Sequence, residues 1–166
     1  MARFRPRAWV RRVAPGRYEV SLAPEERELL GNLVGQLRSL LSETTDDPSM
    51  KRLFPTAYHE DPERDREYQQ LARDELLEHR LATLDTTTAT LEATELDREA
   101  LSAWMSAVND LRLVLGTRLD VSEEGDPPAL DDPEAPAFAV YAYLTEVLDG
   151  IVVALADGLA DEPAQS

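Results

Sequence analysis

The chain has 166 residues, 43% of them hydrophobic, and its 17 Lys and Arg against 33 Asp and Glu give a net charge of −16. This length fits one domain with a sizeable core, and we expect a single domain over residues 1–166. Because the chain has no cysteine, a disulfide scaffold, a thiolate metal site, a cysteine nucleophile and a thiol switch are excluded within it. The negative charge repels nucleic acid and anionic membranes at long range, which excludes a protein that coats DNA.

Charge is unevenly distributed along the chain. The first 18 residues carry six arginines and no acid, which leaves 11 cations and 33 acids, a charge of −22, on the rest. Ala14-Pro15-Gly16-Arg17 places Pro and Gly at the two central positions of a type II turn. Together with the alternation of apolar residues on both sides, this turn predicts a β-hairpin of residues 10–13 and 18–22, within a basic segment and arm over residues 1–22.

Arginines and apolar residues alternate on the first predicted strand. Odd positions give a cationic face with an interleaved aromatic, and even positions, which include Val10, give an apolar face. The guanidinium groups of arginines bind anionic oxygens, and a tryptophan ring can stack. The hairpin is therefore the leading candidate for binding a protein or nucleic-acid partner. The candidate residues are Arg3, Arg5, Arg7, Trp9, Arg11, Arg12 and Arg17. In the alternative interpretation the arginines pair with the acidic helices of the same chain, and Trp9 by itself is more typical of a core.

Residues 23–160 are predicted to form a helical bundle because their apolar residues recur at helical spacing. The first helix, over residues 24–42, has a stripe of leucines and valine. Gly31 and Gly35, four residues apart in this helix, predict close packing against a neighbouring backbone. A short helical turn follows Asp47-Pro48.

Two further helices are predicted in the middle of the chain, with a break between them. One begins near Pro62 and continues to about Leu71, and Asp74 is placed to cap the next. The second uses leucines up to Leu91. The threonines at positions 86–88 and 90 are poor helix formers, so the helical pattern weakens there.

Two long helices complete the predicted bundle. Asp97 caps the first, which continues to about residue 119 and leads into an acidic loop over residues 120–134 with seven acids. The last helix, from Pro133 to about Leu159, is expected to be the central helix, and its acids argue against a membrane span. Its predicted inward stripe is Phe138, Tyr141, Thr145, Leu148, Val152, Leu155 and Leu159.

The fold class is therefore predicted to be mainly α, a bundle of about five helices with an N-terminal β-hairpin and a tail over residues 161–166. No complete catalytic or metal-binding pattern is found in the sequence. Glu75, Glu78 and His79 share part of one helix and His59 precedes two acids, but the Glu-x-x-His spacing of a bundle metal site is absent. The two histidines are accompanied by no Gly-x-Ser-x-Gly turn. We expect no enzymatic activity, no metal and no cofactor.

Two runs of the sequence resemble a known family. They are Arg52-Leu53-Phe54-Pro55-Thr56-Ala57-Tyr58, followed by Glu67-Tyr68, and Trp104, followed by Asn109-Asp110-Leu111-Arg112-Leu113-Val114-Leu115-Gly116-Thr117-Arg118-Leu119. With them, nearly the whole chain resembles the actinobacterial AosR-type oxidative-stress regulators, also catalogued as a domain of unknown function. We expect the family residues to be mainly structural, with Arg112 or Arg118 tethering its helix to a neighbouring segment. These residues are Arg52, Phe54, Pro55, Tyr58, Trp104, Asn109, Asp110, Arg112, Gly116 and Arg118.

The resemblance implies a regulator of the oxidative-stress response that acts on transcription rather than on a metabolite. We expect it to be cytoplasmic, because the first residues lack the apolar core of a secretory signal. The leading mechanism is contact with a protein such as a sigma factor or RNA polymerase, helped by the hairpin; direct DNA contact is secondary because the net charge opposes it. The alternative is a helical adaptor or scaffold unrelated to transcription.

Redox sensing in the family relies on a cysteine pair, and this chain has no cysteine. Any response to oxidants would therefore fall to a partner, or to Met50 or Met105. The apolar stripes of the predicted helices leave room for a homodimer, and no membrane partner is expected.

Overall fold

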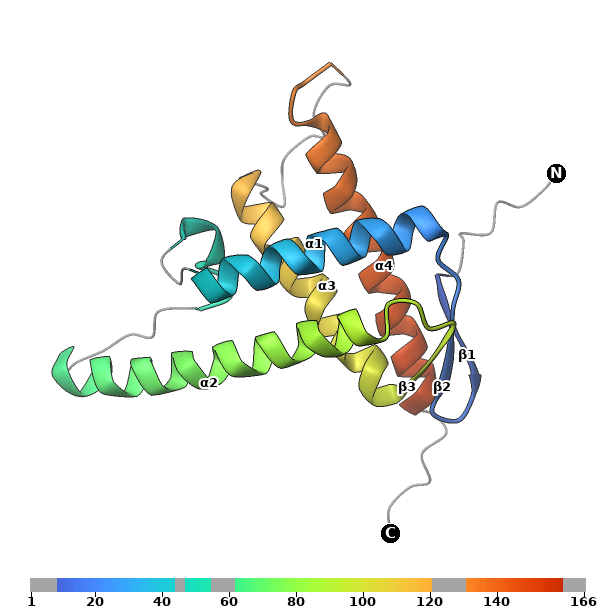
Figure 1. The fold of residues 1–166 in the computed structure, drawn as a ribbon, viewed down its shortest axis with the longest axis horizontal. Coiled ribbons are helices and arrows are strands. Elements are labelled where there is room, and N and C mark those ends of the chain that lie inside the picture. The colour runs from blue at the N-terminus through green and yellow to red at the C-terminus, as the bar shows by residue number, and fades with distance from the viewer. Residues whose placement is uncertain (1–8, 44–46, 55–61, 121–130, 160–166) are drawn as a thin grey trace, which may run out of the picture.

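The structure is a computed structural model that describes residues 9–43, 47–54, 62–120 and 131–159, with the backbone alone for residues 62–65. This part of the chain contains four α-helices, one 3₁₀ turn and a three-stranded sheet (Figure 1). The elements are β1 (Val10–Ala14), β2 (Arg17–Val20), α1 (Pro24–Glu43), η1 (Pro48–Met50), α2 (Pro62–Ala89), β3 (Glu95–Asp97), α3 (Arg98–Arg118) and α4 (Ala135–Leu159). The mainly α class with an N-terminal hairpin is confirmed. Most of the predicted acidic loop and the predicted tail lie outside the described residues.

Helices α1 and α2 lie side by side and cross over α3 and α4, and the sheet packs at one end of this arrangement (Figure 1). One continuous core joins the layers, with side chains from the sheet, η1 and all four helices. Trp104 lies in this core: it is 2% exposed and donates its indole Nε1–H to the Thr90 hydroxyl at 2.7 Å. The buried polar edge of the indole is thereby satisfied without water.

The predicted hairpin is present and belongs to a larger sheet. Strand β1 pairs with β2 in an antiparallel register that places Val10 opposite Val20. Gly16, in the turn between them, has φ of +69°, the left-handed conformation that a type II turn requires at its third residue. The sequence reasoning missed β3, which pairs antiparallel with the other edge of β2. Three residues are too short a run to show the alternation by which strands are recognised.

Helix α2 corrects the prediction of two helices, so the described residues contain four α-helices rather than five. The chain between Leu71 and Asp74 contains no Pro or Gly that would break a helix. Asp74 caps nothing, because its carboxylate accepts a hydrogen bond from the Gln70 amide at 3.1 Å, one turn earlier along the same helix. This i, i+4 contact supports continuity where the prediction placed a break.

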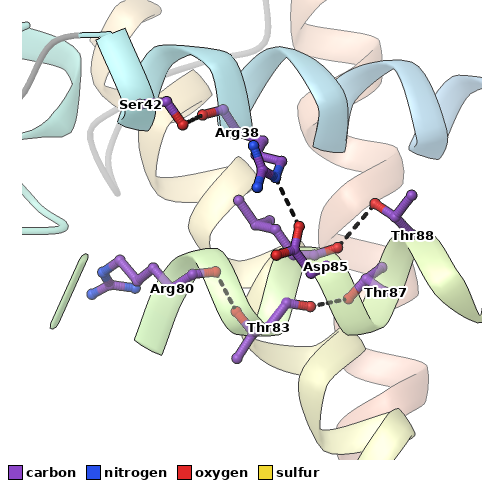
Figure 2. A network of polar contacts seen from close by, with 8 residues as sticks. Arg38, Ser42, Arg80, Thr83, Asp85, Thr87 and Thr88 are labelled. Atoms are coloured by element: carbon purple, nitrogen blue, oxygen red, sulfur yellow. Dashed lines mark hydrogen bonds and ion pairs between the residues drawn. The ribbon is translucent and has the colours of Figure 1, made fainter. Parts of the chain in front are cut away.

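Helix α2 continues through the threonines at which the helical pattern of the sequence weakens. The hydroxyl of Thr87 donates to the Thr83 carbonyl at 2.8 Å and that of Thr88 to the Leu84 carbonyl at 2.9 Å (Figure 2). Thr90, just after the helix, bonds to the Thr86 carbonyl in the same way. Each hydroxyl is thus satisfied by the helix itself, which makes a run of β-branched polar residues compatible with a helix that packs on its neighbours.

Helix α1 agrees with its prediction. Pro24 occupies the first helical position, and the Glu26 carboxylate accepts the N–H of Ala23 at 2.6 Å, which satisfies one of the free donors of the first turn. Gly31 packs closely, but against a side chain and not against a backbone as predicted: a Cβ there would lie 2.7 Å from Cδ2 of Leu91. At Gly35 the predicted close packing is wrong, because a Cβ would meet nothing within 4 Å.

Helix α3 is capped as predicted, because the carboxylate of Asp97 accepts the N–H of Ala100 at 2.8 Å. In α4 the predicted stripe is not the most buried one. Leu148 and Leu155 of this stripe are half-buried and pack against the core. The buried residues are instead Leu144, Val147, Ile151, Ala154 and Gly158, and two residues of the predicted stripe, Val152 and Leu159, are exposed. A helix that is apolar on most sides offers several stripes of similar quality, so spacing alone does not select the buried one.

By length and composition, α4 is the one helix of the described residues that could cross a membrane. A core helix passes the same test, and α4 packs against α3 and β1. Its acids Glu146, Asp149 and Asp157 are all exposed, on the sides that do not face the core.

Candidate functional site

The outer face of the hairpin presents two of the predicted arginines. Arg11 and Arg17 have side chains that are 68% and 62% exposed, and each pairs with a carboxylate of the neighbouring strand. Arg11 Nη2 lies 3.5 Å from Glu19 Oε1, and Arg17 donates from Nε to Glu95. This hydrogen bond from Arg17 lowers the pKa of the Glu95 carboxyl. Both arginines therefore pair within the chain, as in the alternative interpretation, but with acids of the sheet and not with the acidic helices.

The exposed pairs leave the arginines available to a partner. An ion pair in contact with water is weak because solvent screens it and because two long side chains lose freedom in forming it. A partner carboxylate or phosphate could replace Glu19 or Glu95 at small cost. The arginines on the edge strand β1 also have a structural use, because charge on an edge strand opposes pairing with other chains.

The other described members of the predicted ribbon face inward. Trp9 is half-buried and meets the Tyr143 ring of α4 edge-on, with ring centroids 5.4 Å apart and an interplanar angle of 88°. Arg12 is half-buried, and its Cδ lies 4.0 Å from the Cβ position of Gly158. Trp9 is thus a packing residue and does not form a stacking platform next to Arg11. Arg3, Arg5 and Arg7 lie outside the described residues.

Two of the family residues, Asp110 and Phe54, lie at a buried ion pair between α2 and α3. Asp110 is 2% exposed, and its Oδ1 accepts a hydrogen bond at 2.5 Å from Nη1 of Arg80. The same guanidinium donates from Nη2 to the Leu53 carbonyl at 3.0 Å. The Phe54 ring lies beneath it, with the guanidinium carbon 5.9 Å from the ring centroid. One arginine therefore joins α2, α3 and the segment after η1.

Burial shifts the pKa of the Asp110 carboxyl. Loss of solvent raises the pKa of this carboxyl, and the nearby positive charge of Arg80 opposes the rise only in part. Its second oxygen, Oδ2, is buried without a hydrogen-bond partner. Asp110 and Arg80 therefore hold α2 and α3 together in the packed interior of the described residues.

Arg118 lies near a carboxylate of a neighbouring segment, the kind of contact predicted for Arg112 or Arg118, but the pair is long and partly exposed. Its Nη2 lies 4.0 Å from Oδ2 of Asp47. Asp47 is itself fixed, because its Oδ1 accepts the N–H of Ser49 at 2.8 Å and caps η1. Hydrogen bonds from Ser49 and the charge of Arg118 lower the pKa of the Asp47 carboxyl. Arg112 is half-buried and makes no such contact in the described part of the chain; its Nε is buried without a partner.

The remaining family residues contribute packing. A Cβ on Gly116 would lie 3.0 Å from the Tyr141 ring and 3.7 Å from Nη1 of Arg52, so a small residue is needed there. Phe54 and Trp104 are in the core, and Asn109 is half-buried on α3. Pro55 and Tyr58 lie outside the described residues.

Two arginines that matter were missed by the sequence reasoning. Arg80 was overlooked as the partner of Asp110. Arg27 is only 8% exposed and donates to three backbone carbonyls, those of Leu91, Ala93 at 2.9 Å and Val20 at 3.3 Å. It thereby ties the start of α1 to β2 and to the turn before β3. The available signal was its position, because Arg27 continues the buried stripe of α1 one turn before Leu30.

Metal or hydrolytic chemistry gains no support from the arrangement. Among the described residues, no group of three or more His, Asp or Glu side chains could hold a metal ion. Glu75, Glu78 and His79 are exposed on α2, and His59 lies outside the described residues.

Fold and site together define a small helical protein with exposed arginines on a sheet and motif residues that hold its helices together. A family model described as a domain of unknown function (DUF2017) matches residues 1–155, and the chain belongs to this family. The oxidative stress regulators AosR of Mycobacterium tuberculosis and Mycobacterium bovis are each 30% identical to it, over 84% of this chain and 82% of theirs. A relative from Mycobacterium leprae is 29% identical over the same shares. The resemblance inferred from the motifs is confirmed, and no solved structure matches the chain significantly.

Proposed function

We propose that this protein is a non-enzymatic regulator of the oxidative stress response that acts on transcription. The observation that carries the proposal is the likeness to mycobacterial proteins named oxidative stress regulator AosR, which covers most of both chains. Likeness over this length supports a shared scaffold and a shared general role. The described residues add no competing chemistry, because their buried ionisable groups are used to hold the fold.

The regulator acts in the cytoplasm by contact with a protein such as a sigma factor or RNA polymerase. The outer face of the hairpin takes part in this contact. Support comes from Arg11 and Arg17, which are exposed and which, among the described residues, pair with exposed carboxylates. They can exchange these partners for carboxylates of another protein while the fold stays intact.

Direct DNA contact through the same arginines is the secondary mechanism. At physiological salt, interactions between charges are screened over about 8 Å. Distant acids therefore act only weakly on the hairpin, and a phosphate can bind there. The net charge of −16 opposes the approach of DNA as a whole. A protein surface that presents carboxylates carries less negative charge than a DNA duplex. It is therefore repelled less by this chain and is the better partner for the arginines.

The chain takes no part in thiol sensing. It has no cysteine, and Met50 is 1% exposed in the core. Met105 on α3 is half-buried, so an oxidant signal reaches the complex through a partner or through this methionine. A sensor on the partner predicts that the isolated chain binds its partner equally well before and after mild peroxide treatment.

Binding to purified core RNA polymerase and to purified sigma factors of an actinobacterium tests the proposal, with biolayer interferometry as the measurement. The Arg11→Ser/Arg17→Ser variant should bind several-fold more weakly, and its binding should depend less on salt. Arg38→Ser is the matched control, because Arg38 is also exposed and pairs with Asp85 at 2.7 Å, but on the helices (Figure 2). This control should bind as the wild type does.

Three outcomes decide between the mechanisms. Equal binding by the hairpin variant and the control would remove the hairpin from the contact. Tight binding to a promoter duplex at physiological salt, without binding to polymerase or sigma factors, would replace protein contact by DNA contact. Absence of binding to all of these would favour an adaptor unrelated to transcription.

A further inference from the structure

An open groove runs along α1 on the side that faces α3 and α4, with a volume of about 710 Å³. Buried side chains form its floor, and half-buried leucines form its walls. The floor consists of Leu37, Leu111, Val114 and Leu144. The exposed rim is polar, with Asn32, Gln36, Ser39 and Glu43 from α1 and Arg118 from α3. This combination of an apolar floor and a polar rim is that of a recognition site.

Gly35 opens the groove toward the backbone of α1. It lines the groove, and a Cβ at this position would meet nothing within 4 Å. Gly31, one turn earlier, is already covered by Leu91. The absence of a side chain at Gly35 is therefore not needed for packing within the described part of the chain, and it lets another chain approach α1 closely.

The dimensions of the groove fit a helix better than a compact ligand. Its lining extends along α1 from Gly31 to Glu43, twelve steps that at 1.5 Å each span about 18 Å. This is the length of about three helical turns. Small-molecule sites orient their ligands with a few convergent polar groups. None of the lining residues contributes a buried polar side-chain atom that lacks a hydrogen-bond partner.

Charge selects the kind of helix. The chain carries −16 overall and −22 outside its first 18 residues, so the helical body attracts cationic segments and repels anionic ones. At the rim, Glu43 is exposed, while the guanidinium of Arg118 lies near the Asp47 carboxylate. The same field disfavours a second copy of this chain as the occupant, because its helices carry an excess of acids.

We propose that the groove binds a basic amphipathic helix of a protein partner. The helix presents apolar side chains at positions i, i+3 or i+4, and i+7 to the floor, and Lys or Arg toward Glu43 and the net negative charge of the chain. The proposed binding site depends only on the groove and on the charge of the chain. It does not require that the partner belong to the transcription machinery.

A phage-displayed library of randomised helical peptides tests this inference. Binders are selected on the wild-type chain alone, and Gly35→Phe, whose side chain fills the open space in the groove, is reserved for the affinity measurement. The selected sequences should share the i, i+3 or i+4, i+7 apolar pattern and an excess of Lys and Arg. Fluorescence anisotropy with one selected peptide should give a Kd at least about tenfold weaker for Gly35→Phe.

Ala82→Phe is the matched control, because Ala82 is exposed on α2 and does not line the groove. This control should bind the peptide as the wild type does, and equal melting temperatures of the two variants would show that both are folded. Glu43→Lys should weaken binding and reduce its salt dependence, while Glu28→Lys, exposed at the other end of α1, should change it less.

Several results would overturn the inference. No enrichment of peptides, enrichment of acidic or non-periodic peptides, or equal affinity for wild type and Gly35→Phe would each contradict it. Self-association of the wild type that Gly35→Phe abolishes would show that a second copy occupies the groove.

Discussion

The Arg17–Glu95 and Arg80–Asp110 pairs have the same chemistry in two different surroundings. Arg17 and Glu95 have side chains 62% and 42% exposed on the sheet, whereas Arg80 and Asp110 are 17% and 3% exposed between helices. Hydrogen bonding dominates at the first pair and lowers the pKa of Glu95; burial dominates at the second and raises the pKa of Asp110. Solvent therefore decides the role of each pair: the exposed pair can exchange partners, and the buried pair holds two helices in register.

The largest expected effect comes from leaving half of the buried pair in place. Arg80→Met removes the guanidinium that compensates the charge of Asp110 and donates a hydrogen bond to the Leu53 carbonyl. This variant should lower the free energy of unfolding by about 3–5 kcal/mol. The double variant Arg80→Met/Asp110→Leu should recover most of the loss, because it buries no uncompensated charge. Urea unfolding gives both values. Arg38→Met is the control on an exposed pair, and a single-variant loss no greater than the control's would refute a structural role for the buried pair.

A second test extends the comparison to a buried arginine that pairs with no carboxylate. Arg27→Met leaves the carbonyls of Leu91, Ala93 and Val20 without their donor and should cost about 2–3 kcal/mol. Amide hydrogen exchange should quicken in β2 more than in α3, because Arg27 ties the sheet to α1. Arg27→Lys should restore part of the stability, and Glu28→Met is the exposed control. Uniform quickening of exchange would show that Arg27 supports the whole fold rather than the joint with the sheet.

The pH dependence of stability separates the two pairs by sign. Because the pKa of Asp110 is raised in the folded state, the folded protein binds more protons than the unfolded chain between the ordinary carboxyl value of 3.8 and the raised value. The contribution of Asp110 to the unfolding free energy is therefore fully present below 3.8 and is lost as the pH rises through this window. Each unit between the two values corresponds to about 1.4 kcal/mol.

The measurement is the difference in unfolding free energy between wild type and Asp110→Asn across acid pH, which removes contributions of the other acids. The unfolding free energy of the wild type minus that of Asp110→Asn should fall as the pH rises. Glu95→Gln should give a difference with the opposite slope, because hydrogen bonding lowers the pKa of Glu95 in the folded state. A flat or rising difference for Asp110→Asn would mean that Arg80 outweighs burial.

The smallest expected effect on stability belongs to the hairpin. Arg11→Ser/Arg17→Ser should leave the melting temperature unchanged within error, because both lost pairs are exposed to solvent. A clear decrease that high salt does not remove would mean that these arginines clamp the sheet. Their assignment to a binding surface would then fail.

The sequence by itself determined the class, the hairpin, the capped helix after Asp97 and the family, because each depends on local signals. Turn residues, caps and apolar spacing act over a few residues, so the Pro15-Gly16 turn and the stripe of α1 could be recognised in isolation. The exposed positions of Arg11 and Arg17 followed from the same alternation. The predicted break in α2 was wrong because a capping residue in a helical sequence can also bond along the helix, as Asp74 does with Gln70.

Tertiary structure decided which of several equivalent surfaces is buried and which distant residues meet. The inward side of α4 is Leu144, Val147 and Ile151 rather than the stripe of Tyr141 and Leu148, since contact with α3 and β1 selects one stripe among many apolar ones. Strand β3 exists because β2 offers it an open edge. Arg80 meets Asp110 from 30 residues away, and Arg27 reaches carbonyls 64 and 66 residues away. Such contacts depend on the free energy of burying charge in a finished core, which no local pattern encodes.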